Sequence, residues 1–571
     1  MEKKKLPVGI DNFAKVIEDN YYYVDKSLLI KDIIKAGSEV TLFTRPRRFG
    51  KSLNMSMLEN FFSAEGDKSI FDGLEISKDE EFCDRYMGKY PVISISLKQV
   101  EGDDFDSAKG MFKSVIGCEA DNFYFLLNSE KLSEDDKKDY RSLIERSTRD
   151  NNSRFAMSDV MLKDSLKTLS TLLYKHYQKK AVILIDEYDV PLDKARFHDY
   201  YDEMVTLIRN MFGAALKTND NLAFAVLTGC LRISKESIFT GLNNFDVRSI
   251  TNIEYTEYFG FTEDEVAEIL DYYELSSRSK DVKKWYDGYK FADKNIYCPW
   301  DVLKFCSEAI VQPNIIPRDY WSNSSGNSIV RDFVKIATGE TIGEIERLVA
   351  GETIQKKIKE DLTYRDIDND IDNLWSVLFS TGYLTGTVDE DDGRTYNLYI
   401  PNLEVHELFV DQISTWFKNK LHKDTSSAEK FYSAAIDGKP DTMEKVLCRI
   451  LSKSISIRDT FAKKDIRENF YHGFILGLLQ PYPEVYSNRE GGNGFSDIMF
   501  VDDDSDTAVI LELKYSDSDE IDTMEKECKK ALDQIEKMKY ADNPRLRVID
   551  HVKKYGVSFN KKIACVRMKQ Q

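Results

Sequence analysis

The chain has 571 residues, with 80 Lys or Arg against 99 Asp or Glu, which gives a net charge of −19 at pH 7. Its length predicts about three or four domains. Charged residues make up 31% and aromatic residues 12%, with only 12 Pro, so a collagen-like or low-complexity chain is excluded. The net negative charge also argues against binding to nucleic acid through bulk electrostatic attraction.

The compartment follows from what the sequence lacks. The amino-terminal residues carry charge but no apolar core of a signal peptide, and no run reaches the roughly 18 apolar residues of a membrane helix. The eight Cys are isolated, without a CxxC pair, and the six His are scattered. We therefore expect a cytoplasmic protein with reduced thiols, no zinc site and no membrane partner.

The first half of the chain alternates short apolar runs with amphipathic stretches, which is typical of a parallel α/β sheet. The predicted strands are Val40–Thr44, Val92–Leu97, Ala181–Ile185, Leu222–Thr228 and Val247–Ile253. We expect an α/β domain over residues 1–260, a mostly helical region over 261–425 and a second α/β domain over 426–571. In the later parts the expected elements are a hairpin of Tyr383–Val388 and Thr395–Ile400, helices Arg458–Leu479 and Asp519–Lys539, two or three strands between these helices, and a last strand Lys561–Met568.

A phosphate-binding loop follows the first strand. Gly50, Lys51 and Ser52 stand between that strand and a helical run, which is the context that a P-loop requires. Gly50 would let the backbone approach a phosphate, Lys51 would neutralise its oxygens, and the Ser52 hydroxyl would bind Mg²⁺. Arg45 departs from the motif because it stands where the first Gly is usual, and Pro46 stiffens the loop.

The strand at Ala181–Ile185 leads into two adjacent carboxylates. Asp186 would hold Mg²⁺, and Glu187 would act as general base toward the attacking water. Thr228 ends the next strand and is the candidate sensor of the γ-phosphate, while Arg232 or Arg248 could stabilise charge on the transferred group. The predicted nucleotide contacts are Arg45, Pro46, Arg47, Arg48, Phe49, Gly50, Lys51, Ser52, Asp186 and Thr228.

A second cluster of acidic and basic residues lies near the carboxyl terminus. Glu512 and Lys514 alternate along one strand and so share a face, and a hairpin can place Asp497 beside Glu512. The two carboxylates suit Mg²⁺, and Lys514 can orient or deprotonate a water. Glu468 could complete this metal site, whereas His472, four residues later, is read mainly as a packing residue. Residues 521–571 also carry 13 Lys or Arg against 7 Asp or Glu, which favours phosphate contacts nearby.

Several runs together resemble a known family. They are Leu6–Phe13, Tyr22–Lys26, Thr44–Ser52, Leu184–Asp189, Thr228–Phe239 and Lys284–Tyr289. They look like the bacterial AAA-ATPase-like proteins fused to a PD-(D/E)XK nuclease domain. The resemblance implies an AAA-type P-loop sheet, a helical and winged-helix-like lid, and a nuclease-like α/β domain. It makes Arg45 a family trait, and it implies that Gln534, with Tyr540, belongs to an extra motif whose Gln approaches the nuclease site.

The leading hypothesis is an ATP- and Mg²⁺-dependent enzyme that acts on nucleic acid, with DNA as the expected target. The alternatives are a nucleotide-switched regulatory protein whose nuclease-like domain only binds, and an ATPase with an inactive nuclease domain. A homo-oligomer stays open, because AAA-type modules often take an arginine from a neighbour.

Overall fold

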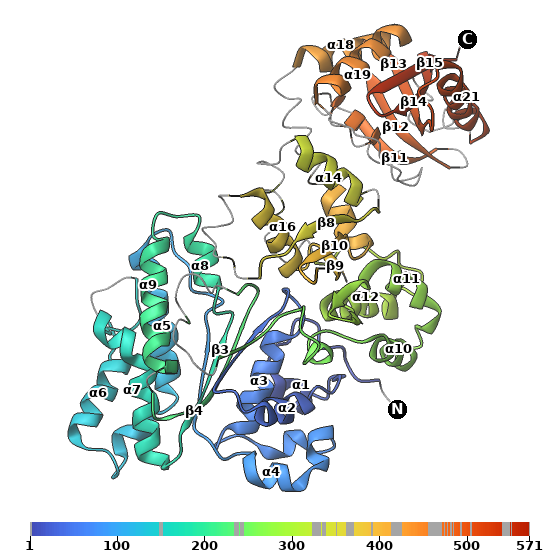
Figure 1. Ribbon diagram of the computed structural model, residues 1–571. Helices are drawn as coiled ribbons and strands as arrows, with labels where there is room; N and C mark the ends of the chain where they lie inside the picture. Colours follow the sequence, from blue (N-terminus) through green and yellow to red (C-terminus); the bar gives the residue numbers. More distant parts are fainter. Residues whose placement is uncertain are drawn as a thin grey trace. The chain divides into compact units, whose positions relative to one another are not determined.

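The computed structural model folds into two compact units (Figure 1). The first comprises Met1–Ser325, Lys356–Tyr396 and Pro401–Glu404, and the second Gly326–Gln355, Asn397–Ile400 and Val405–Gln571. The structure describes residues 3–147, 152–217, 219–232, 239, 245–321, 330, 333, 339–349, 351–360, 362, 370–389, 392–410, 412, 425–454, 471–472, 474–476, 478–479, 482, 485–491, 494–502, 505–538, 549 and 551–569. The expected three-part division stays a prediction.

The first unit is built on a five-stranded parallel sheet in the order β2-β3-β4-β1-β5. Its strands are β1 (Val40–Thr44), β2 (Val92–Ser96), β3 (Ala181–Asp186), β4 (Leu222–Gly229) and β5 (Phe245–Arg248). Strands β1 and β3 are buried along their whole length, which explains their continuous apolar sequence. The predicted strand Val247–Ile253 was wrong in its bounds, because a turn follows Arg248 in which the Ser249 amide donates to Asn252 Oδ1.

Helices cover both faces of this sheet, with α1, α2 and α3 on one face and α5, α7 and α9 on the other (Figure 1). The helices up to β4 are α1 (Phe13–Glu18), α2 (Leu28–Ala36), α3 (Lys51–Phe62), α4 (Glu80–Tyr86), α5 (Phe105–Asp121), α6 (Glu134–Ile144), α7 (Asp159–Tyr177), α8 (Val190–Ala195) and α9 (Tyr201–Phe212). Helix α3 begins directly after the predicted P-loop, so the loop lies at the carboxyl end of β1.

The middle of the chain is mostly helical, as predicted. It contains α10 (Glu263–Tyr272), α11 (Ser279–Tyr286), the hairpin β6 (Tyr289–Phe291) and β7 (Lys294–Ile296), α12 (Pro299–Val311), α14 (Gly339–Val349) and α16 (Ile371–Ser380). The predicted hairpin is confirmed as β9 (Thr385–Val388) and β10 (Thr395–Tyr399), which form a small sheet with β8 (Ile354–Lys357). The aromatic side chains Tyr286, Tyr289 and Trp321 are buried, so they pack a core.

The second unit contains a mixed sheet in the order β11-β12-β13-β14-β15. Only the β13–β14 pair is parallel in this sheet. The elements are α18 (Thr425–Asp437), α19 (Pro440–Ser454), β11 (Val485–Gly491), β12 (Gly494–Asp502), β13 (Thr507–Tyr515), α21 (Ile521–Lys537), β14 (His551–Asn560) and β15 (Ile563–Met568). The predicted helix Asp519–Lys539 and the last strand are confirmed, whereas β14 was not predicted. Most of the predicted helix Arg458–Leu479 lies outside the described residues.

Within the described part of the chain, every helix is too short or too polar to cross a membrane.

Candidate functional sites

The loop between β1 and α3 has the backbone of a tight phosphate-binding turn. Arg48 and Gly50 both adopt left-handed conformations, with φ of 72° and 82°. Gly50 caps the amino end of α3, and a Cβ there would meet no atom of the described residues within 4 Å, so the glycine serves the left-handed backbone conformation and leaves space on that side. The first amides of α3 therefore open onto a space where an anion could bind.

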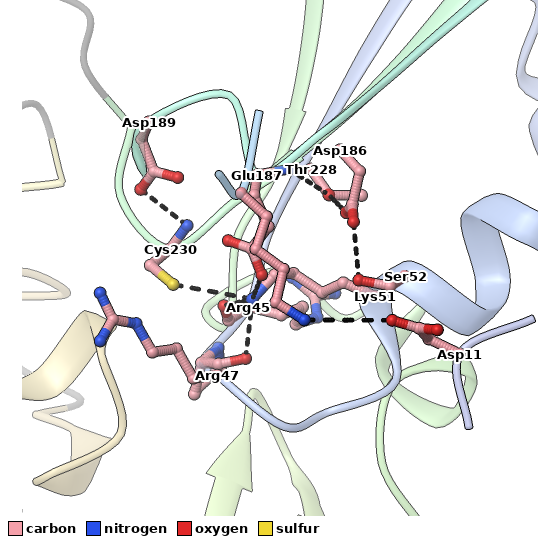
Figure 2. Close-up of polar contacts among 12 residues, drawn as sticks. Asp11, Arg45, Arg47, Lys51, Ser52, Asp186, Glu187, Asp189, Thr228 and Cys230 are labelled. Carbon is pink, nitrogen blue, oxygen red and sulfur yellow. Dashed lines mark hydrogen bonds and ion pairs between the residues drawn. The ribbon is translucent and has the colours of Figure 1, made fainter. Parts of the chain in front are cut away.

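Lys51 lies within the curve of this loop and is only 3% exposed. Its Nζ donates to the carbonyls of Arg45 and Pro46, each at 3.1 Å, and lies 3.4 Å from Glu187 Oε1 (Figure 2). Burial alone would lower the pKa of Lys51, but Cys230 and the acids Glu187, Asp189 and Asp186 outweigh it, so the pKa is raised. Lys51 is thus a fully charged donor held by the loop and by the predicted general base.

Asp186 ends β3 and contacts Ser52, the other predicted magnesium ligand of this site. Ser52 Oγ donates to Asp186 Oδ2 at 2.6 Å, and Thr228 Oγ1 donates to the other carboxylate oxygen (Figure 2). Burial, followed by the charge of Glu187, raises the pKa of Asp186. Two hard oxygens so close together fit a Mg²⁺ ion, which Ser52 and Asp186 would hold.

Thr228 also accepts the Glu187 amide at 3.3 Å. Glu187 itself has a φ of 52°, a conformation that is uncommon outside Gly, Asn and Asp. The structure therefore brings Lys51, Ser52, Asp186, Glu187 and Thr228 together at the carboxyl ends of β1, β3 and β4.

The Arg45 side chain is buried inside the domain, although its motif position predicted a contact with the nucleotide. It is completely buried, and its Nη1 donates to the carbonyls of Thr44 (2.9 Å) and Arg248 (2.7 Å). The guanidinium lies over the rings of Phe259 and Phe291, and burial lowers its pKa to about 9. Its side chain thus stabilises the loop through contacts inside the domain. A direct contact between Arg45 and a nucleotide stays a prediction.

The other loop residues also have partners within the first unit. Arg47 pairs with Asp193 at 3.2 Å, and the Arg48 guanidinium lies 4.1 Å from the Trp300 ring centre. Phe49 is buried against Tyr289 and Phe291, and Pro46 lies against Gly382, where a Cβ would come within 2.9 Å of it. Of the candidate arginines, Arg248 binds the carboxylates of Asp246 and Glu254.

Asp189 is a site residue to which the sequence reasoning gave no role. Its buried carboxylate accepts the amides of Cys230 (2.9 Å) and Leu231 (3.0 Å), so it fixes the chain just after Thr228. Burial, then Glu187, raises the pKa of Asp189 to about 6. The available signal was its place two residues after the predicted base, in the run Leu184–Asp189 that carried the family resemblance.

The second unit brings Asp497, Glu512 and Lys514 together on neighbouring strands. Asp497 Oδ2 accepts the Leu513 amide at 2.8 Å, and Lys514 Nζ lies 3.3 Å from Glu512 Oε1. Glu512 is 1% exposed, and its buried Oε2 has no hydrogen-bond partner among the residues that the structure describes. Burial, followed by the charge of Asp497, raises the pKa of Glu512 to about 7. The pair of carboxylates beside a cation fits a Mg²⁺ ion, with Asp497 and Glu512 as the residues that would hold it.

The structure describes only some of the remaining residues predicted for this site. Glu468 and Tyr540 lie outside the described residues. His472 Nε2 bonds to the Asp497 carbonyl at 2.8 Å, and Gln534 is half-buried on α21. Among the residues that the structure describes, no three His, Cys, Asp or Glu side chains are grouped as a metal cluster would require. The role of each residue stays a prediction.

Comparison with known proteins gives two family matches. Residues 7–239 match a family described as "Predicted AAA-ATPase", and residues 466–569 match the PD-(D/E)XK nuclease superfamily. An uncharacterized protein from the vnfD 5′ region of Azotobacter chroococcum mcd 1 is 28% identical over 410 residues, 71% of this chain and 69% of that protein. A Walker-type ATPase of Pyrococcus abyssi is similar at 13% identity and a TM-score of 0.34, over 72% of this chain and 98% of that one. Residues 7–239 are therefore a predicted AAA-ATPase domain, and residues 466–569 are a domain of the PD-(D/E)XK nuclease superfamily.

Proposed function

We propose that this protein binds and hydrolyses ATP and couples that cycle to a Mg²⁺-dependent nuclease that acts on nucleic acid, with DNA as the expected target. The observation that carries the proposal is the convergence of Asp497, Glu512 and Lys514 on β12 and β13. Two carboxylates and one lysine come together there from two neighbouring strands, in a domain of a nuclease superfamily.

The chemistry of cleavage can be assigned to named side chains. A Mg²⁺ ion held by Asp497 and Glu512 would polarise a phosphodiester and lower the pKa of a bound water. Lys514, 3.3 Å from Glu512, would orient that water and balance the charge that develops on the phosphate. Lys and Arg of the last fifty residues would contact neighbouring phosphates.

The ATPase half uses the cluster around the P-loop. Lys51 and the first amides of α3 would hold the phosphates, and Ser52 with Asp186 would hold Mg²⁺. Glu187 would have to exchange its contact with Lys51 for one with water before it could act as a base. Phosphate binding at Lys51 would favour this exchange, because it supplies the lysine with another anion.

The direct test is cleavage by the purified full chain. Supercoiled and linear duplex DNA, single-stranded DNA and RNA are incubated with Mg²⁺ or with a chelator, for the wild type and for Asp497→Ala, Glu512→Ala and Lys514→Ala. We expect metal-dependent cleavage that each substitution removes. Cleavage that survives all three substitutions would contradict the site, and parallel assays with ATP and with Lys51→Ala test the coupling.

A second function is favoured by the ion pair between Lys51 and Glu187. The pair occupies both the lysine that would bind phosphate and the predicted general base. This arrangement suits a protein that binds nucleotide as a switch and hydrolyses it slowly. In that case the nuclease-like domain would be a binding module. Steady-state ATP hydrolysis that Glu187→Gln abolishes would exclude this function, whereas tight binding without turnover would support it.

A further inference from the structure

Two buried carboxyl groups meet in the first unit, close to the P-loop but outside the predicted nucleotide contacts. Asp301, in the first turn of α12, is 0% exposed, and Glu404 is 1% exposed. Glu404 Oε1 accepts the amides of Tyr320 and Trp321, the latter at 2.7 Å. No N–H group among the described residues bonds to Glu404 Oε2 or to either carboxyl oxygen of Asp301.

The two carboxyl groups lie close enough for a hydrogen bond to join them. Such a bond needs a proton, because two ionised carboxylates offer only acceptors. Burial raises the pKa of Asp301 to about 6 and raises that of Glu404 well above its ordinary value. Like charges this close in a dry core cannot both ionise without strong repulsion.

A short chain of contacts joins this acid pair to the P-loop. The Cys298 thiol, at the amino end of α12, lies beside Asp301 and donates to the Arg48 carbonyl at 3.8 Å. Arg48 is the loop residue with a φ of 72°, and its guanidinium lies over Trp300 in the same helix turn as Asp301. Phe49, the next loop residue, packs on Tyr289, 5.0 Å between ring centres.

The charges around the pair leave the proton as its main stabiliser. Of the described residues, the Arg48 guanidinium, which stacks on Trp300, lowers the pKa of Asp301. The negative charge of Asp319 raises it. The titratable groups that face the pair from the packed elements are Arg48, Tyr286, Tyr289, Cys298 and Asp319.

We propose that Asp301 and Glu404 share one proton and act as positioning residues that hold the Arg48–Phe49 part of the P-loop in shape for the nucleotide. The proposal rests on the proposed nucleotide binding of the same loop. Loss of the proton places two negative charges in the core, which drives the start of α12 away from Pro401–Glu404 and releases the Arg48 carbonyl. The protein would therefore bind nucleotide more weakly as the pH rises.

The test replaces the shared proton with a permanent donor. In Glu404→Gln, the amide oxygen still accepts the Tyr320 and Trp321 amides, and the amide nitrogen donates to Asp301 at every pH. The full chain and this variant are titrated with a fluorescent ATP analogue from pH 7 to pH 9. The matched control is Glu274→Gln, an exposed acid that pairs with Lys3 instead of with a residue that faces the acid pair.

We expect wild-type affinity to fall by up to about tenfold per pH unit above the pKa of the pair, because one proton is lost. The control should follow the wild type, and Glu404→Gln should be flat. Equal pH slopes for the wild type and Glu404→Gln would overturn the proposal. Asp301→Asn supplies a donor from the other side of the pair and repeats the test if Glu404→Gln does not fold.

Unfolding by denaturant without nucleotide separates this proposal from the proposed function. The pair has a raised pKa in the folded state, so its stabilisation is full at low pH and is lost as the pH rises. Glu404→Gln should remove that loss even if the wild type binds no nucleotide at any pH, in which case only the proposed function fails. If neither amide variant folds, exchange of the Tyr320 and Trp321 amides in the wild type decides, and equal protection at low and high pH, after correction for intrinsic rates, overturns the proposal.

Discussion

The two candidate sites satisfy their buried charges in different ways. Around the P-loop, Lys51 is bound by two carbonyls and Glu187, and Asp186 accepts hydrogen bonds from Ser52 and Thr228. In the nuclease-superfamily domain, Glu512 has Lys514 on one oxygen, whereas its other oxygen is buried with no hydrogen-bond partner in the described part of the chain. A buried acceptor left without a partner costs free energy, so this site gains from a cation, whereas Lys51 and Asp186 already have partners within the P-loop site.

The difference indicates that ligand binding changes the two sites unequally. A nucleotide must displace contacts within the P-loop cluster, whereas a metal ion can add to the pair of carboxylates without breaking a bond to Glu512 Oε2. Variants that remove one charge from each site therefore test the comparison directly.

The largest effect is expected from Glu512→Gln. The amide keeps the size of the side chain but removes the negative charge that would hold Mg²⁺, and cleavage should fall on the order of 1,000-fold. Initial rates of DNA cleavage at saturating Mg²⁺ measure it. Glu520→Gln, an exposed acid at the start of α21, is the matched control, and equal loss in both variants would show that the effect is not specific to the site.

Lys51→Ala should have the next largest effect, on nucleotide binding. It removes the cation that faces the phosphates and leaves Glu187 without its partner, so affinity should fall about 100-fold. Calorimetric titration with a non-hydrolysable ATP analogue measures the change, and exposed Lys15→Ala serves as control. Unchanged affinity would mean that the nucleotide, if bound, lies away from this loop.

Much of the fold and part of each site could be predicted because they follow from local patterns. Strands β1 and β3 were found because strands buried on both faces are continuous apolar runs. Glu512 and Lys514 were placed together because side chains alternate along a strand. Strand β14 was missed because it begins with His551-Val-Lys-Lys554 and contains Gly556, where α21 comes so close that a Cβ would lie 2.1 Å from the Cys528 carbonyl.

What escaped prediction depends on contacts between distant segments. The motif position of Arg45 suggested phosphate, but the direction of its side chain is decided by Phe259, Phe291 and the Arg248 carbonyl. Asp301 and Glu404 carry no local signal, since each reads as an ordinary surface acid until the chain brings them together. Sequence spacing thus predicts which groups lie on the same helix or strand. It does not predict which carboxyl groups share a proton or which aromatic rings surround an arginine.

Gly229→Ala should destabilise the P-loop site through packing alone, without changing any of its charges. A Cβ at this position would lie 2.5 Å from the Tyr188 ring and 2.8 Å from Asp189 Oδ1, so the loop after β3 would have to move. We expect a loss of about 1–3 kcal/mol in the free energy of unfolding. Gly213→Ala, where a Cβ would meet no atom of the described residues within 4 Å, is the control, and denaturant unfolding in which both variants match the wild type would contradict this packing.

The smallest expected effect is the pH dependence of Mg²⁺ binding to the nuclease-superfamily domain. Because the pKa of Glu512 is raised to about 7, its carboxyl must lose a proton to bind metal below that pH and is already ionised above it. Affinity should therefore rise by up to about tenfold per pH unit below pH 7 and then level off. Calorimetry of the Lys51→Ala chain in buffers of different ionisation heat should detect about one proton released per Mg²⁺ at pH 6 and almost none at pH 8. Equal proton release at both values would mean that Glu512 is not the group that binds the ion, and the contrast between the two sites would then rest on Asp497 alone.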